Sequence, residues 1–212
     1  MDYVLFTLWG YDMTYMEMTA LLSGLLAVYL AVKNNVLTWP IGLLNVTLSG
    51  IIFFHIQLYA DMFLQMYFFL SGLYGWYAWS KGMHETPIKV LSKSTKIRLA
   101  TLVLVLTFVV GFVVSNLHEY FPSVFIKKAS YAYLDTMLAL LSILANTLLA
   151  LRYFENWILW IVIDVISVAL YFQKGVKLIA LEFMVFLILA VMGHLEWQKE
   201  IKTNSNQKPL IV

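Results

Sequence analysis

Seven long apolar stretches, each close to the length that crosses a lipid bilayer, dominate this sequence. About 20 consecutive apolar residues span the hydrocarbon core as an α-helix, because backbone groups in lipid must bond within their own segment. Hydrophobic residues make up 62% of the chain and charged residues 12%, whereas an ordinary soluble domain is about a quarter charged. The sequence therefore predicts an all-α integral membrane protein, with transmembrane helices near 14–32, 39–56, 59–79, 96–117, 134–151, 156–173 and 176–197.

The basic residues are distributed unevenly between the two sides of the predicted membrane. Seven crossings place the termini on opposite sides, and the side that holds the C-terminus is the more basic. Because cytoplasmic loops carry the excess of Lys and Arg, we expect the N-terminus outside and the C-terminus in the cytoplasm. The C-terminal side holds Lys33, Lys81, Lys89, Lys93, Lys96, Arg98, Arg152, Lys199, Lys202 and Lys208, and the other side holds Lys127, Lys128, Lys174 and Lys177.

The N-terminal segment and the amino-acid composition exclude several other features. The sequence "MDYVLFTLWGYDM" is acidic and lacks a basic region and a small-residue cleavage site, so no signal peptide is expected. The chain has no cysteine, which rules out disulfides and thiolate metal sites.

Short sequence matches on either side of the central helix predict an internal repeat. "KNNVLTW" resembles "RYFENWILW", which pairs Asn35 and Trp39 with Asn156 and Trp160, and "GWYAW" resembles "GHLEW". A single linker helix between two three-helix units gives both units the same orientation, as in the parallel repeats of some transporters. The predicted divisions are a first three-helix repeat at 14–82, a linker helix at 96–117, a second three-helix repeat at 133–198 and a cytoplasmic tail at 199–212.

Polar residues recur at helical spacing on four of the predicted helices. Such residues inside a membrane usually face the bundle interior or a solute pathway, so four stripes with this period predict one shared polar cavity. Tryptophans near helix ends also suit interfacial anchoring, and amides also suit bonds between helices. The stripes comprise Trp39, Gly42, Asn45 and Ser49; Gln57, Asp61, Gln65, Gly72 and Trp76; Asp135, Ser142 and Asn146; and Trp157, Trp160, Asp164, Ser167 and Tyr171.

Asp164 is the candidate site residue that structure alone explains least. At 1.5 Å per residue it lies about 12 Å from the cytoplasmic end of its helix, near the middle of a core about 30 Å thick. No Lys or Arg lies in the interior of a predicted helix to pair with it. An ionised carboxylate at this depth needs a cationic partner or takes up a proton, so a cationic ligand is one solution and protonation is the other.

The sequence favours a solute transporter over other classes of membrane protein. No metallopeptidase or serine-hydrolase motif is present, and His55 and His194 lie at opposite ends of the membrane, where they cannot ligate one haem. We therefore expect no enzyme activity, no cofactor, no metal and no nucleic-acid partner. An aromatic-rich interior suits a bulky organic solute better than an ion. A signalling or partner-binding membrane protein is a more distant alternative, because the chain has no soluble output domain.

Two long stretches resemble the PnuC family of bacterial vitamin transporters. They are "WPIGLLNVTLSGIIFFHIQLYADMFLQMYFFLSGLYGWYAWSKG" and "DTMLALLSILANTLLALRYFENWILWIVIDVISVALYFQKG". The resemblance implies a fold similar to SWEET transporters with three plus one plus three helices, a homotrimer in the bacterial inner membrane, and facilitated diffusion of a vitamin that a cytoplasmic kinase then traps. It also implies a pocket around Asn156 and Trp160, Asn35 and Trp39, and the polar stripe of the third helix.

Nicotinamide riboside and thiamine, two vitamins of this family, both carry a flat cationic ring. Aromatic faces attract such cations, so Trp39, Trp157 and Trp160 are predicted to stack on the ring while Asp164 holds its charge. The remaining polar groups of the substrate are assigned to Gln57, Gln65, Asn45 and Asn146. Asp61 and Asp164 depart from the pattern of the nicotinamide riboside branch, which leaves thiamine as the alternative substrate.

Overall fold

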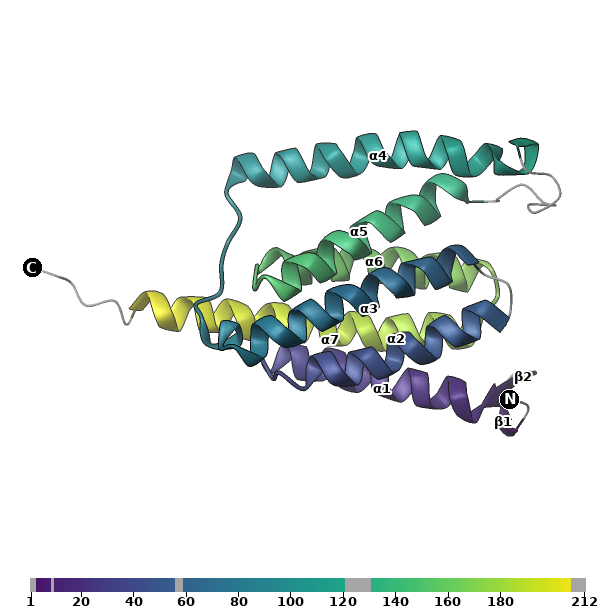
Figure 1. The fold of residues 1–212 in the computed structure, drawn as a ribbon, viewed down its shortest axis with the longest axis horizontal. Coiled ribbons are helices and arrows are strands. Elements are labelled where there is room, and N and C mark those ends of the chain that lie inside the picture. Colours follow the sequence, from purple (N-terminus) through teal and green to yellow (C-terminus); the bar gives the residue numbers. More distant parts are fainter. Residues whose placement is uncertain (1–2, 9, 56–58, 121–130, 207–212) are drawn as a thin grey trace, which may run out of the picture.

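The described residues of the computed structural model form seven α-helices preceded by a small β-hairpin (Figure 1). They cover 3–8, 10–55, 59–120 and 131–206. Strands β1 (Val4–Leu8) and β2 (Tyr11–Thr14) pair antiparallel. The helices that follow are α1 (Tyr15–Val32), α2 (Thr38–His55), α3 (Tyr59–Ser80), α4 (Lys93–Tyr120), α5 (Ala132–Ala150), α6 (Glu155–Gln173) and α7 (Lys177–Asn206), with a short 3-10 helix, η1 (Met83–Glu85), between α3 and α4.

The helix boundaries agree closely with those predicted, except where α4 and α7 are longer. Helix α7 continues to Asn206, so most of the predicted tail is helical. The N-terminal β-hairpin corrects the expectation of a purely helical chain. Gly10 has a φ of +80°, a conformation that glycine adopts at no steric cost, and it lets β1 turn back into β2. Thr14 and Glu17 then form a capping box that starts α1.

Within the described residues, six helices are long and apolar enough to cross a membrane, namely α1, α2, α4, α5, α6 and α7. Helix α3 has 22 residues, also sufficient in length, but its polar and aromatic residues leave it outside this group. Six of the seven predicted spans are therefore confirmed as helices long and apolar enough to cross, and the crossing by α3 stays a prediction. Large apolar side chains are exposed along these helices, as expected where lipid is the solvent.

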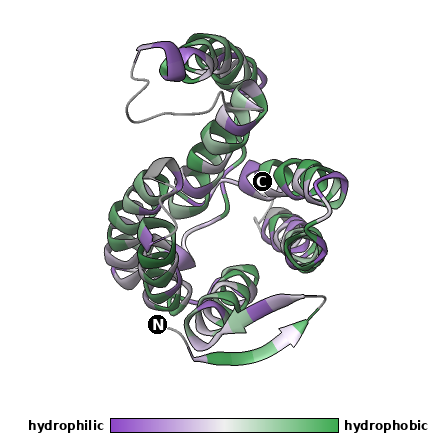
Figure 2. Cartoon of the chain, turned by 90° about the vertical axis from the view of Figure 1, so that its right-hand side faces the viewer, coloured by the Kyte–Doolittle hydropathy of each residue, from purple (hydrophilic) through white to green (hydrophobic). Residues whose placement is uncertain are grey.

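Six of the helices pack in a closed cycle. Each helix contacts the next in the order α1, α2, α3, α5, α6, α7, and α7 in turn contacts α1. Figure 2, which looks along the helix axes, shows this arrangement and the predominantly hydrophobic helices that build it. Helix α4 contacts α5 from outside the cycle, and an apolar groove of about 380 Å³ between α4, α5 and α6 contains none of the predicted site residues.

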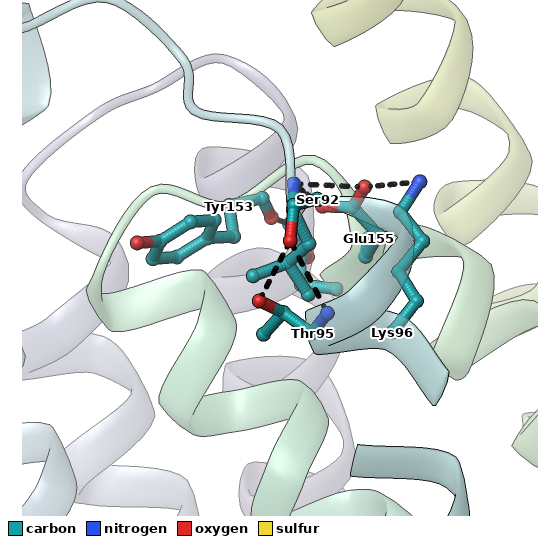
Figure 3. Close-up of polar contacts among 7 residues, drawn as sticks. Ser92, Thr95, Lys96, Tyr153 and Glu155 are labelled. Carbon is teal, nitrogen blue, oxygen red and sulfur yellow. Dashed lines mark hydrogen bonds and ion pairs between the residues drawn. The ribbon is translucent and has the colours of Figure 1, made fainter. Parts of the chain in front are cut away.

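The first turn of α4 is fixed to the start of α6 (Figure 3). Both carboxylate oxygens of Glu155 accept from the backbone N–H of Leu91 at 3.1 Å, and Lys96 Nζ lies 2.7 Å from the same carboxylate. Ser92 Oγ accepts from the backbone N–H of Thr95 at 3.2 Å and caps the helix. Glu155 is buried, so this ion pair sets the position of α4 relative to α6.

The most deeply buried cluster of the bundle lies at the end that carries the C-terminus. It contains the ends of α1, α3 and α5, the starts of α2 and α6 and the middle of α7, with four tryptophans among its members. In α2 the buried residues are Thr38 and Trp39, both at this end. The described part of the chain is therefore packed most tightly at one end. The buried cluster comprises Ala31, Val32, Trp39, Ala78, Trp79, Ile88, Leu149, Ala150, Trp157, Ala190 and Trp197.

Candidate functional site

Two tryptophan–glycine contacts have the same geometry in the two halves of the chain. Trp39 on α2 meets Trp79 on α3 edge to face, with ring centroids 5.4 Å apart and an interplanar angle of 85°. Trp157 on α6 meets Trp197 on α7 at 5.7 Å and 84°. A Cβ added to Gly75 would lie 2.6 Å from the Trp39 indole, and one added to Gly193 would lie 2.5 Å from the Trp157 indole. Both glycines are needed because an indole occupies the place of a side chain.

The turns that precede these tryptophans also match. Asn34 between α1 and α2 has a φ of +54°, and Arg152 between α5 and α6 has a φ of +59°, both in the left-handed region that residues other than glycine seldom adopt. Asn34 and Arg152 are 118 residues apart, which is also the separation of Trp39 from Trp157 and of Gly75 from Gly193. The two helical hairpins thus repeat one local geometry.

This geometry corrects the alignment that the sequence suggested. The sequence paired Trp39 with Trp160, whereas the contacts with Gly75 and Gly193 pair Trp39 with Trp157. Trp160 is half-buried and packs against the buried cluster. The register of the match is set by which indole lies on a glycine, and the Asn–Trp spacing does not reveal that.

Several buried polar atoms near these tryptophans lack a partner in the described structure. The indole N–H groups of Trp39, Trp157 and Trp197 are buried and have no acceptor there, and the Oδ1 atom of Asn156 has no donor. Trp157 is 1% exposed and Asn156 is fully buried. Asn156 uses its Nδ2 atom within its own turn, donating to the carbonyl of Tyr153 at 2.7 Å. Buried polar groups are normally bonded, so these atoms can serve a solute or water.

Asp164 lies inside the bundle, as the sequence predicted. Its residue is 3% exposed, and Ser167, three positions further along the same face of α6, is equally buried. Asp164 has no hydrogen bond or ion pair with any described residue. A lone carboxylate in such surroundings is costly unless a cation or a donor accompanies it, and this requirement makes Asp164 the central candidate for binding a positively charged solute.

The predicted amides serve first as links between helices. Asn45 on α2 donates to the carbonyl of Ala20 on α1 at 2.7 Å, and Gly24 leaves room for its amide. Asn146 on α5 donates to the hydroxyl of Ser71 on α3 at 2.6 Å. Each amide has a second N–H and a carbonyl oxygen, so a helix-linking role leaves bonding capacity for a solute.

The remaining predicted residues lie toward the opposite end of the bundle. Gln65 is half-buried on α3, where its Cβ faces Gly50 of α2. Asp61 is exposed in the first turn of α3, and its charge interacts with that of Asp135 on α5. Gln57 lies outside the described residues. The structure therefore separates the predicted site into a buried group near the C-terminal end and an exposed acidic group near the other end.

Two sets of polar contacts in the structure do not follow from the sequence patterns. Tyr67 on α3 bonds to the hydroxyl of Thr147 on α5 at 2.6 Å, and Arg152 joins Asn34 to Glu200 at the C-terminal end. From the sequence, Arg152 is only one of the basic residues that predict the orientation of the chain in the membrane. The sequence signal that could have identified it is its place, together with Asn34, in the two matched turn motifs.

Comparisons with known proteins agree with this architecture. A family model described as nicotinamide mononucleotide transporter matches residues 14–199. The nicotinamide riboside transporter PnuC of Escherichia coli (strain K12) is 34% identical over 207 residues, covering 89% of this chain and 87% of that protein. The riboflavin/roseoflavin transporter RibM of Streptomyces davaonensis is 23% identical, covering 97% and 94%.

A solved structure has the same fold. The crystal structure of the vitamin B3 transporter PnuC superposes with a TM-score of 0.69 at 24% identity, covering 89% of this chain and 83% of that one. The family resemblance that the two long sequence stretches suggested is confirmed. With a matching family model over most of its length and a relative at 34% identity, this chain belongs to the nicotinamide mononucleotide transporter family.

Proposed function

We propose that this protein is a multi-pass transporter of the bacterial inner membrane that imports nicotinamide riboside by facilitated diffusion. The relatives from Escherichia coli, Shigella flexneri and Neisseria mucosa are nicotinamide riboside transporters by name, which favours this substrate over thiamine. The observation that carries the proposal is Asp164, a buried carboxylate without a cationic partner in the described structure. The pyridinium ring of nicotinamide riboside supplies the missing positive charge.

The substrate site is proposed to extend from Asp164 to the tryptophans and amides around it. Trp39, Trp157 and Trp160 would present aromatic faces or indole N–H groups, and the unpartnered indole N–H groups of Trp39 and Trp157 support this role. The free Oδ1 of Asn156 suits a ribose hydroxyl. Asn45, Asn146, Gln57, Gln65 and Asp61 complete the proposed set.

Transport is proposed to use two like-oriented repeats, α1–α3 and α5–α7, with α4 as the linker. The matched hairpins and their constant separation of 118 residues support this 3+1+3 arrangement, as does the position of α4 outside the cycle of six helices. In this proposal α3 makes the seventh crossing, the N-terminus lies outside and the C-terminus lies in the cytoplasm. The two repeats rock about the central site to give alternating access.

A cytoplasmic kinase and a homotrimeric assembly are further parts of the proposal, both taken from the family resemblance. Phosphorylation after entry would add charge to the vitamin and prevent its return, so diffusion alone would give net uptake. Proteoliposomes without a kinase are therefore expected to equilibrate nicotinamide riboside across the membrane without accumulating it. The outer face of α4 exposes many apolar side chains, which lipid or neighbouring subunits would cover.

The test is substrate binding and exchange by an Asp164→Asn variant. In purified protein, the dissociation constant for nicotinamide riboside is expected to rise about tenfold, or ~1.4 kcal/mol, with counterflow in proteoliposomes falling in parallel. Asp12→Asn in the N-terminal hairpin is the control and should leave both unchanged. Competition with thiamine and with uncharged riboflavin checks the substrate. An unchanged dissociation constant in the Asp164 variant would remove this residue from the site.

A further inference from the structure

The turns of the two matched hairpins contact each other at the C-terminal end of the bundle. Arg152 Nη1 donates to the Oδ1 atom of Asn34 at 3.2 Å. The carboxylate of Glu200, near the end of α7, accepts from both residues, from Asn34 Nδ2 at 2.7 Å and from Arg152 Nη2 at 2.8 Å. Three side chains therefore form a closed set of hydrogen bonds that connects the α1–α2 turn, the α5–α6 turn and α7.

This set of bonds is largely shielded from water. Arg152 is 1% exposed and its guanidinium lies 5.6 Å from the ring centroid of Trp197, while the side chain of Glu200 is 33% exposed. Burial lowers the pKa of Arg152, and the charge and hydrogen bond of Glu200 oppose that change. Charge-assisted bonds are stronger than neutral ones, and separating a buried charge from its partner is costly. Opening this contact therefore requires the buried guanidinium of Arg152 to be hydrated as it leaves the carboxylate of Glu200.

The same end has further bonds between the two three-helix groups, which are α1–α3 and α5–α7. The indole N–H of Trp79 on α3 donates to the carbonyl of Ala150 at the end of α5 at 3.1 Å. At the rim, Lys33 and Glu196 form a more exposed ion pair at 3.4 Å. At the opposite end, the like charges of Asp61 and Asp135 oppose each other and Lys174 attracts Asp135. The bonds of Trp79 and Lys33 therefore add to the closure of the molecule at its C-terminal end.

We propose that Asn34, Arg152 and Glu200 form a latch that holds the two three-helix groups together at the C-terminal end and separates each time substrate leaves through that end. The inference rests on the proposed function, because a gate requires a transported solute. It assigns the state in this structure as closed at the C-terminal end. Glu200 makes both of its bonds only in the closed state, because it accepts from Asn34 of one group and from Arg152 of the other.

Cross-linking tests the latch directly, because the chain contains no native cysteine. The variant Asn34→Cys with Glu200→Cys, treated with a short reducible thiol cross-linker, joins the two groups at the latch. Exchange of nicotinamide riboside in proteoliposomes is expected to fall at least tenfold on cross-linking and to return on reduction, while binding persists. The matched control is Lys96→Cys with Glu155→Cys, which joins α4 to α6 within one side of the molecule and should leave exchange unchanged.

A milder variant avoids dependence on the double cysteine protein. With a reporter cysteine at the buried Ala150, Glu200→Gln is expected to raise the rate of maleimide labelling about three- to tenfold by weakening the closed state. Glu196→Gln, one turn earlier on α7 and in the exposed rim pair, should raise it less than about twofold.

The outcomes separate the latch from the function beneath it. Full exchange by the cross-linked protein, or unchanged labelling in Glu200→Gln, would overturn the latch while leaving the transporter in place. Absence of both binding and exchange in the unmodified protein would instead overturn the proposed function, and with it the latch.

Discussion

The two ends of the helical bundle differ in how they are held together. The C-terminal end contains the buried cluster of four tryptophans and a set of ion pairs that includes Arg152 with Glu200 and Lys96 with Glu155. The opposite end contains the exposed carboxylates of Asp61 and Asp135, the Lys174 side chain that attracts Asp135, and an aromatic pair of Tyr171 with Phe183. The buried aromatic packing and these ion pairs therefore lie at the end through which substrate is proposed to leave.

Adding one carbon at the C-terminal end gives the largest expected change. Gly193→Ala places a Cβ 2.5 Å from the indole of Trp157, which is 1% exposed, so we expect a loss of about 1–3 kcal/mol of stability from overpacking. Thermal unfolding of the detergent-solubilised protein measures it.

The matched control for this substitution is Gly42→Ala. Its added Cβ would lie 3.8 Å from the nearest atom, the Cβ of Ala27, which is an ordinary van der Waals contact. We expect no loss of stability, and a small gain is consistent with alanine's higher helix propensity. Equal effects at the two glycines would contradict the close fit of Gly193 to the Trp157 indole.

Removing a charge at the opposite end should have a smaller effect and the reverse sign. Asp61→Asn relieves repulsion from Asp135 between α3 and α5, so stability is expected to rise by up to about 0.5 kcal/mol at low salt. The gain should shrink as salt is added, because exposed charges are screened. Thermal unfolding in low and high salt measures both, and a loss of stability would show that Asp61 has a stabilising partner.

The smallest effect concerns the N-terminal hairpin and depends on pH. Burial and then the hydrogen bond to Glu17 raise the pKa of Tyr11 to about 12. Because the folded state holds the phenol proton more tightly, the contribution of Tyr11 is present below about pH 10, the value of a free tyrosine, and is lost toward pH 12. The stability difference between the native chain and Tyr11→Phe should therefore narrow across this range. If this stability difference stays constant from about pH 10 to pH 12, the contact of Tyr11 does not depend on its ionisation.

Much of the helical architecture could be predicted from the sequence, because a bilayer fixes the length and composition of the segments that cross it. The burial of Asp164 was also predictable, because a carboxylate between Ile163 and Val165 on an apolar membrane helix avoids lipid by facing the interior of the bundle. The pairing of Trp39 with Trp157 was not, because it depends on which indole faces a glycine on the next helix. The role of Arg152 was hidden for a similar reason: its partners, Asn34 and Glu200, are distant in sequence.

The N-terminal strands show a different limit. The strand Val4–Leu8 is apolar at every position except Thr7, so it shows no alternation and is easily taken as the approach to the first span. The turn at Gly10 distinguishes the two possibilities, and its conformation follows from the local backbone.

The connection between α3 and α4 determines where the polypeptide could be divided. His84 bonds to the carbonyl of Trp79 and stacks on its ring, which fastens η1 to α3, whereas Lys89 bonds to the backbone of Arg152 and Phe154, which fastens the next stretch to the α5–α6 turn. The segment between His84, which is bound to α3, and Lys89, which is bound to the α5–α6 turn, is thus only a few residues long and includes the exposed Pro87. Two separately expressed fragments, one ending and the other beginning near Pro87, are expected to reassemble into an intact molecule.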